Sequence, residues 1–203
     1  MRSTLNLVRC VPFILAAAAF PMAAAAQEQS AARSATVVSG TLSFVGHATV
    51  GEFVGSTSAV SGAAVGDLSE LRGWVEAPVA TLVTGNKRRD RDLRASMEVE
   101  RYPTMRLDVS SATTVSSGAV RGDTLNAILH GHLTIHGVTR VVDLPVIVSR
   151  TADTIHVTAT FPLDLADYRI GGLKKLLGLL SMRRRIEVRV DLRWRAAGSG
   201  LLL

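Results

Sequence analysis

Apolar and polar residues alternate with a period of two through most of the chain after about residue 35. In the clearest segment, RRIEVRVDLRWR at residues 184–195, Ile, Val, Leu and Trp occupy one set of alternate positions and charged residues occupy the other. This alternation is typical of a strand with one buried face. Seven further segments have strand character: 36–46, 52–64, 70–83, 104–114, 123–135, 138–149 and 154–163. Eight strands in one chain predict an all-β sandwich or an up-and-down barrel.

One segment that breaks the alternation predicts a helix. In NKRRDRDLRASMEVERYP, residues 86–103, Leu93 and Met97 lie one helical turn apart, and Pro103 provides a stop. Its alternating charges indicate a solvated helix face, although a site for phosphate or an anionic headgroup is the alternative.

A second helical segment is predicted in GGLKKLLGLLSM, residues 171–182. Its leucines have helical spacing, Lys174 and Lys175 fall on the other side, and its glycines make the helix short or irregular. Two interpretations stay open for it. The segment either dips into a membrane surface during ligand exchange or plugs one end of a barrel.

A hairpin is predicted in AILHGHLTIHGVTRVVDLPV, residues 127–146. His136 and Gly137 stand between two alternating runs, and both residue types tolerate the positive φ that a type I′ turn requires. This turn pairs Ile135 with Val138. The same register pairs Thr134 with Thr139, His132 with Val141, Gly131 with Val142, His130 with Asp143, Leu129 with Leu144 and Ala127 with Val146. Apolar residues then gather on one face, as a buried strand face requires.

The histidines of this hairpin raise the question of a metal site. His130 and His132 fall side by side on the outer face, but a zinc site needs three or four protein ligands. His136 is six residues from His130, which is roughly 20 Å along an extended strand at ~3.3 Å per residue. Asp143 is the remaining candidate ligand, yet it is better placed for a cross-strand ion pair with His130. A solvated polar face is therefore favoured over a weak metal site at His130 and His132.

The N-terminus has the pattern of a secretory signal peptide. Arg2 and Arg9 precede an apolar run at residues 11–20. Ala24, Ala25 and Ala26 then provide a small-residue cleavage site. We expect cleavage near Ala26 and a periplasmic or secreted protein, with a retained N-terminal anchor as the alternative. Cys10 is the chain's one cysteine and would be lost with this segment.

The remainder predicts one domain. We expect a disordered linker at 27–35, a barrel domain at 36–195 and a disordered tail at 196–203. Removing residues 1–26, which hold two arginines and no acidic residue, changes the formal net charge from +6 to +4. This excess suits transient contact with an anionic membrane surface, whereas nucleic acid is not an expected partner of an exported chain with 4% aromatic residues.

Four stretches carry a resemblance to a known family. They are VEAPVATLVTGNKRRDRDLR, VERYPTMRLDVSS, GHLTIHGVTRVVDLPV and YRIGGLKKLLGLLSMRRRIEVRVDL. Their order and spacing resemble the YceI-like family of exported lipid-binding proteins. In the hairpin, His136, Gly137 and Val138 match the family pattern, while His130 and His132 do not.

The resemblance implies an antiparallel, eight-stranded, lipocalin-like barrel with one or two short helices at its mouth. It also implies an amphiphilic long-chain ligand of the polyisoprenoid or fatty type, held without a cofactor by a monomer or homodimer. No catalytic motif is present in the sequence, so we expect a binding protein and not an enzyme.

The expected cavity wall consists of inward-facing, mostly apolar positions. They are Val75, Ala77, Val79, Met105, Leu107, Leu129, Gly131, Leu133, Leu144, Val146, Val157 and Ala159. Small members such as Gly131 would leave space for a lipid chain, whose burial is worth about 0.8 kcal/mol per CH₂ group. The alternative is a structural or interaction module in which the same residues fill a solid core.

Overall fold

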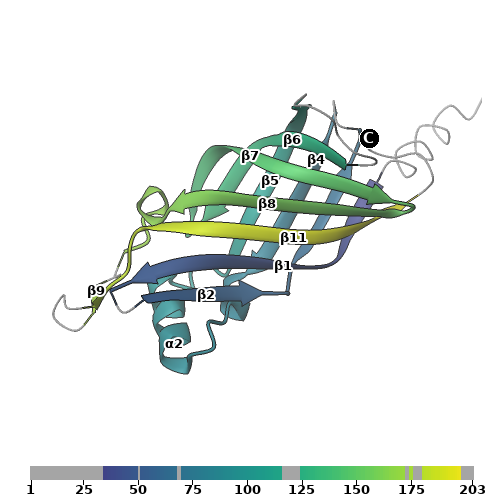
Figure 1. The fold of residues 1–203 in the computed structure, drawn as a ribbon. Helices are drawn as coiled ribbons and strands as arrows, with labels where there is room; N and C mark the ends of the chain where they lie inside the picture. Colours follow the sequence, from purple (N-terminus) through teal and green to yellow (C-terminus); the bar gives the residue numbers. More distant parts are fainter. Residues whose placement is uncertain are drawn as a thin grey trace, which may run out of the picture.

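Antiparallel strands make up most of the described chain (Figure 1). The computed structural model describes residues 34–49, 51–67, 70–115, 124–171, 174–175 and 180–197. The expected signal peptide at 1–26 lies outside the described residues, as do 27–33 of the expected linker and 198–203 of the expected tail.

Nine longer strands form the main sheet. They are β1 (Ser34–Ala48), β2 (Gly51–Thr57), β3 (Ser61–Val65), β4 (Arg72–Pro78), β5 (Thr104–Thr114), β6 (Thr124–Ile135), β7 (Val138–Thr151), β8 (Thr154–Asp164) and β11 (Arg185–Ala197). The short strands β9 (Lys174–Lys175) and β10 (Leu180–Ser181) pair with each other. Helical turns occur at η1 (Val79–Thr81), α2 (Lys87–Ser96) and η2 (Leu165–Tyr168).

The main sheet closes into a barrel through β1. The strand order is β11-β8-β7-β6-β5-β4-β3-β1-β2, and β11 also pairs with β1. On its other side, β1 pairs with β3 near its start and with β2 along its second half. The result is an antiparallel eight-stranded barrel with β2 as an extra strand. The predicted barrel is confirmed, and the sandwich alternative is wrong.

Several predicted boundaries differ from the structure. The predicted strand 52–64 is divided into β2 and β3, because each pairs with a different part of β1. The predicted strand 70–83 ends at Pro78, so Val79 begins a 3₁₀ turn instead of continuing the sheet. The barrel also extends two residues beyond the expected domain at each end, where Ala35 and Ala196 are buried.

The helix predicted in 171–182 is wrong for its described residues. Lys174–Lys175 and Leu180–Ser181 form a small antiparallel pair, which lies beyond the barrel end in Figure 1. In a run composed mainly of leucine, lysine and glycine, apolar residues fit both periods, so the spacing does not discriminate. Leu173, Leu176 and Leu177 lie outside the described residues.

The predicted hairpin is confirmed in its turn and its register. His136 and Gly137 have φ of 51° and 70°, and every predicted pair between β6 and β7 is observed. His136 has a further role, because its ring is buried. Its Nδ1 donates to the Tyr168 carbonyl at 3.1 Å, and its ring centroid lies 4.6 Å from that of Tyr102. The turn is thereby anchored to η2 and to the segment that follows α2.

Helix α2 is shorter than predicted because both of its ends are capped. The side chain of Asn86 accepts hydrogen bonds from the backbone N–H groups of Arg88 and Arg89. At the other end Glu98 adopts φ of 45° and donates from its N–H to the Ala95 carbonyl, while Val99 N–H reaches the Arg94 carbonyl. This Schellman-type end stops the helix before Pro103.

A buried carboxylate fixes the loop before α2. Asp90 Oδ1 accepts from the Thr84 backbone N–H at 2.8 Å and from the Thr84 hydroxyl at 2.6 Å. The Thr84 hydroxyl bond lowers the pKa of Asp90 below its usual value, with Arg94 and Arg89 adding to the effect and burial opposing it. Because Thr84 lies on the cavity wall described below, this contact sets the position of one side of the site.

We predict that Gly137→Ala destabilises the hairpin by about 2 kcal/mol. Alanine at this positive φ is strained, and its Cβ would collide with the Tyr102 ring. Urea unfolding measures the loss. Gly171→Ala is the control, because a Cβ there meets nothing within 4 Å. Equal losses in the two variants would contradict the assignment.

We also predict that Asp90→Asn lowers the thermal stability at neutral pH and not in acid. A lowered folded-state pKa stabilises the fold above the ordinary value of 3.8, and this contribution is lost as the pH falls through the folded pKa. Melting temperatures of both proteins across this pH range should converge in acid. Glu100→Gln, at an exposed position after α2, controls for the loss of one negative charge. A difference that stays constant with pH would exclude the mechanism.

Candidate functional site

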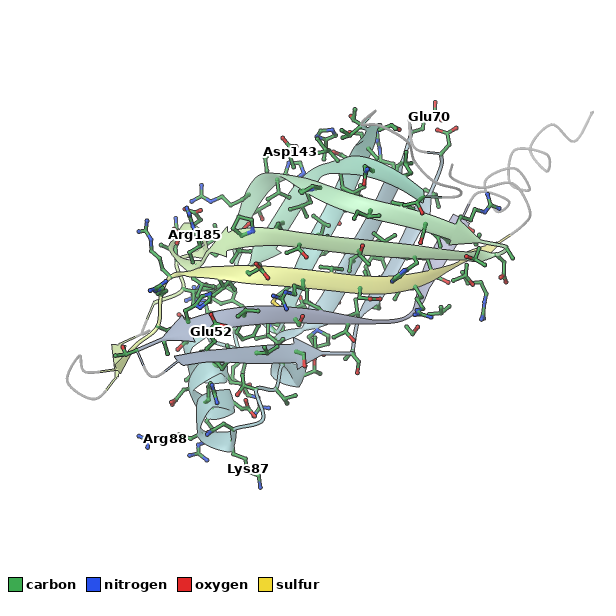
Figure 2. The ribbon with its side chains drawn as sticks, viewed as in Figure 1. Glu52, Glu70, Lys87, Arg88, Asp143 and Arg185 are labelled. Carbon is green, nitrogen blue, oxygen red and sulfur yellow. The ribbon has the colours of Figure 1, made fainter. Side chains whose placement is uncertain are left out.

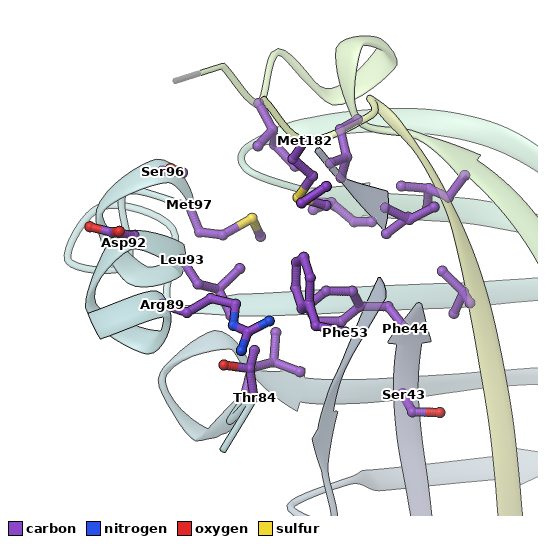
Figure 3. A pocket seen from close by; sticks show the side chains of 18 of the residues that line it. Ser43, Phe44, Phe53, Thr84, Arg89, Asp92, Leu93, Ser96, Met97 and Met182 are labelled. Carbon is purple, nitrogen blue, oxygen red and sulfur yellow. The ribbon is translucent and has the colours of Figure 1, made fainter. Parts of the chain in front are cut away.

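A cavity of about 650 Å³ lies at the end of the barrel next to α2 (Figure 3). Side chains from β1, β2, β5, β6, β8, β11 and α2 line it, together with residues that follow η1 and residues from η2 onward. Its inner wall is apolar and includes Phe44, Phe161, Leu163, Ile186 and Val188. Since most of this wall belongs to one buried cluster, the cavity occupies the core of this half of the barrel.

Two phenylalanines opposite two glycines shape one wall. Across β1 and β2, Phe44 faces Gly55 and Phe53 faces Gly46. A Cβ on either glycine would collide with the ring opposite it. The glycines therefore let both rings lie close over the partner strand, where they meet edge to face with centroids 6.1 Å apart. Sequence analysis missed this pair, and its signal was the spacing of Phe and Gly in SFVGHATVGEFVG.

The polar part of the cavity is concentrated at its rim. Most of these groups come from α2 and the loop before it: Thr84, Asn86, Arg88, Arg89, Asp92 and Ser96. The Arg89 guanidinium carbon lies 4.4 Å from the centroid of the Phe53 ring, a cation–π contact that is visible in Figure 3. An apolar interior with a charged rim suits an amphiphilic molecule.

The other half of the barrel holds a second buried cluster. It surrounds Trp194 and includes Ala35, Ile155 and Leu192, and none of these residues lines the cavity. Gly62 allows close packing here, because a Cβ on it would lie 3.1 Å from the Trp194 ring. The interior is therefore divided into a half near α2 that holds the cavity and a half packed around Trp194.

The positions expected to line a cavity are divided in the same way. Met105 and Leu133 line it. Val75, Leu129, Val146, Val157 and Ala159 pack in the cluster around Trp194. Ala77, Val79 and Leu144 are buried and Leu107 is partly buried, but none of the four lines the cavity. Alternation identified the inward face of each strand but not the distance of a residue from the open end.

Gly131 has a different reason for being small. A Cβ on Gly131 would collide with the Asp108 carbonyl, at the point where the register of β5 shifts between Val109 and Ser111. Glycine therefore permits close approach of the two backbones at a bulge. The space that this residue was expected to leave is occupied by the neighbouring strand.

The two outer-face histidines differ in their surroundings: His130 forms hydrogen bonds, and His132 is exposed. His130 Nδ1 lies 2.7 Å from Asp143 Oδ1, as the predicted register requires, and its Nε2 lies 2.9 Å from the Thr113 hydroxyl. Both ring nitrogens are thus occupied, while His132 is exposed. Among the described residues no group of three or more His, Cys, Asp or Glu side chains is arranged to hold a metal ion. Within the same part of the chain, no helix combines the length and apolar character needed to cross a membrane.

Comparisons with known proteins agree with this architecture. A polyisoprenoid-binding domain from Saccharophagus degradans, implicated in plant cell wall breakdown, matches with a TM-score of 0.68 at 20% identity, covering 80% of this chain and 98% of that one. BcnA of Burkholderia cenocepacia matches with a TM-score of 0.62 at 18% identity, over 76% and 95% of the two chains. The YceI protein of Campylobacter jejuni matches with a TM-score of 0.54 at 17% identity, over 68% and 82%.

These identities are low enough that the likeness concerns the fold alone. No curated protein sequence matches the chain significantly. The family described as the YceI-like domain, however, matches residues 14–194, which is most of the sequence. The chain belongs to the YceI-like domain family.

Proposed function

We propose that this protein binds a long-chain amphiphilic lipid, of the polyisoprenoid or fatty type, and acts as a carrier without catalysis. The observation that carries the proposal is the cavity of about 650 Å³, whose apolar wall ends at a polar rim. This volume falls within the ~300–1,000 Å³ range of small-molecule sites. The polyisoprenoid-binding domain of S. degradans, which shares the fold, supports the same ligand class.

The proposed affinity comes from burial of the hydrocarbon tail. Each buried CH₂ group contributes about 0.8 kcal/mol, so ten such groups contribute about 8 kcal/mol before the cost of association is subtracted. The wall suits this role because Met97, Met105 and Met182 adapt to irregular shapes. Binding of this kind needs no reactive group.

We predict that Leu133→Trp lowers lipid occupancy about tenfold, because overpacking a site costs of order 1–3 kcal/mol. Native mass spectrometry of protein purified without detergent, followed by organic extraction, gives the occupancy and the lipid mass. Val141→Trp is the control, because Val141 is 77% exposed on β7 outside the barrel. Circular dichroism verifies that both variants fold. Repeated wild-type preparations without lipid would favour the structural module instead.

We further propose that the chain is exported to the bacterial envelope and that the cavity mouth contacts an anionic membrane surface. The export proposal rests on the Arg, apolar and Ala pattern of residues 1–26. The contact proposal rests on exposed basic residues at the mouth end, among them Lys87 and Arg185, which are labelled in Figure 2. Arg183 is also exposed and directly follows Met182 of the cavity wall. Each basic residue near such a surface contributes about 1 kcal/mol.

Export predicts an intact mass that lacks residues 1–26 for protein recovered from the periplasmic fraction or medium. A full-length mass would exclude cleavage.

Membrane contact predicts flotation with vesicles that contain phosphatidylglycerol and not with pure phosphatidylcholine vesicles. Changing Lys87, Arg183 and Arg185 together to Gln should abolish flotation. Equal flotation with both kinds of vesicle would exclude the electrostatic contact.

A further inference from the structure

We propose that the bound lipid carries an oxyanion head group, a phosphate monoester or a carboxylate, which Arg88 and Arg89 hold at the rim of the cavity. This inference rests on the proposed lipid-binding function and specifies the ligand class of the same site. A neutral lipid would satisfy the apolar wall but would leave these two charges without a counterpart.

Both arginines lie where a head group would leave the apolar interior. Each lines the cavity from the first turn of α2, with Arg88 exposed and Arg89 half-buried. The contact with Phe53 holds the Arg89 guanidinium beside the aromatic wall, 4.4 Å from the ring centroid (Figure 3). A tail packed against Phe44 and Phe53 therefore brings its head group close to Arg89.

Neither guanidinium forms an ion pair within the described part of the chain. By contrast, Arg184 pairs with Asp164 at 3.0 Å and Arg189 with Glu187 at 2.7 Å. The carboxylates near the rim are Glu52 and Asp92. Glu52 Oε1 lies 2.9 Å from His47 Nδ1, and no ion pair within the described residues joins Asp92 to Arg88 or Arg89.

Asp90 compensates the charge of Arg89 only in part. This carboxylate contributes to the local field, but its Oδ1 accepts both hydrogen bonds from Thr84. The Asp90 side chain is buried, so it is directed to the loop and not to the ligand. Asp90 therefore does not occupy the side-chain N–H donors of Arg89.

The guanidinium groups, and not the helix terminus, provide the binding chemistry. The N–H groups of Arg88 and Arg89 are already bound by the Asn86 side chain. A guanidinium presents several N–H donors in a planar fork that matches phosphate and carboxylate oxygens. Both residues line the cavity, so each fork lies at the rim where a head group would emerge.

Competition between matched lipids tests the inference. Lipid-free protein is incubated with equal amounts of geranylgeranyl monophosphate and geranylgeraniol, and the bound ratio is read by native mass spectrometry. We expect the protein to bind the phosphate in about tenfold excess over the alcohol, because one charge-assisted hydrogen bond contributes about this much to affinity. A second pair, palmitate and 1-hexadecanol, distinguishes the two oxyanions. A preference in both pairs supports either oxyanion, and a preference in one pair alone assigns the site to that oxyanion.

The variants assign the preference to the two arginines. In the double variant Arg88→Gln, Arg89→Gln the ratio should fall to about one. Arg88→Gln alone should give an intermediate ratio, and it preserves the Arg89 contact with Phe53 if the double variant does not fold. Arg91→Gln is the matched control, because Arg91 is exposed on α2 and does not line the cavity, so its ratio should equal that of the wild type.

Two outcomes would overturn the inference in different ways. Equal binding of the charged and neutral lipids by the wild type would exclude head-group recognition and leave lipid binding intact. Binding of none of the four lipids would exclude the proposed function together with the inference.

Discussion

Pairing of β1 with β11 creates the interior on which every other feature depends. Without it, the sheet would end in two open edges, and the alternating strands would have no common inside. The other side of β1 serves β3 and then β2, so one strand both closes the ring and supports the Phe44–Phe53 wall. The cavity is thus a product of closure combined with the extra strand at one end.

The segment around α2 gives the barrel an asymmetric end. Asp90 holds Thr84, Asn86 caps the helix, and Arg89 packs on Phe53, so three neighbouring residues of one short segment have separate tasks. On the same end, His136 connects the β6–β7 turn to Tyr168. The rim is therefore built from α2 and from loops that are held by specific polar contacts, whereas most of the wall is built from strands.

Sequence patterns predicted the strands and the hairpin well because these depend on local periodicity. The His136–Gly137 turn set the whole β6–β7 register, and its observed φ values have the sign that was expected. The cavity wall was harder to predict. Alternation separates inside from outside, but Leu133 and Leu129 share one face of β6 and still lie in different halves of the interior. Gly131 shows a second limit, since a backbone bulge on β5 and not ligand space explains its size.

The cluster around Trp194 has a consequence for the size of the proposed lipid. Because this cluster packs the other half of the barrel, a hydrocarbon chain bound beside α2 in the proposed way would meet buried side chains and not a through-channel. The depth of the cavity would then limit the length of hydrocarbon chain that can be buried. A proposed ligand whose chain fits would be covered completely, whereas a longer one would have to fold back on itself or leave its excess in water, at a cost that grows with every additional isoprene unit.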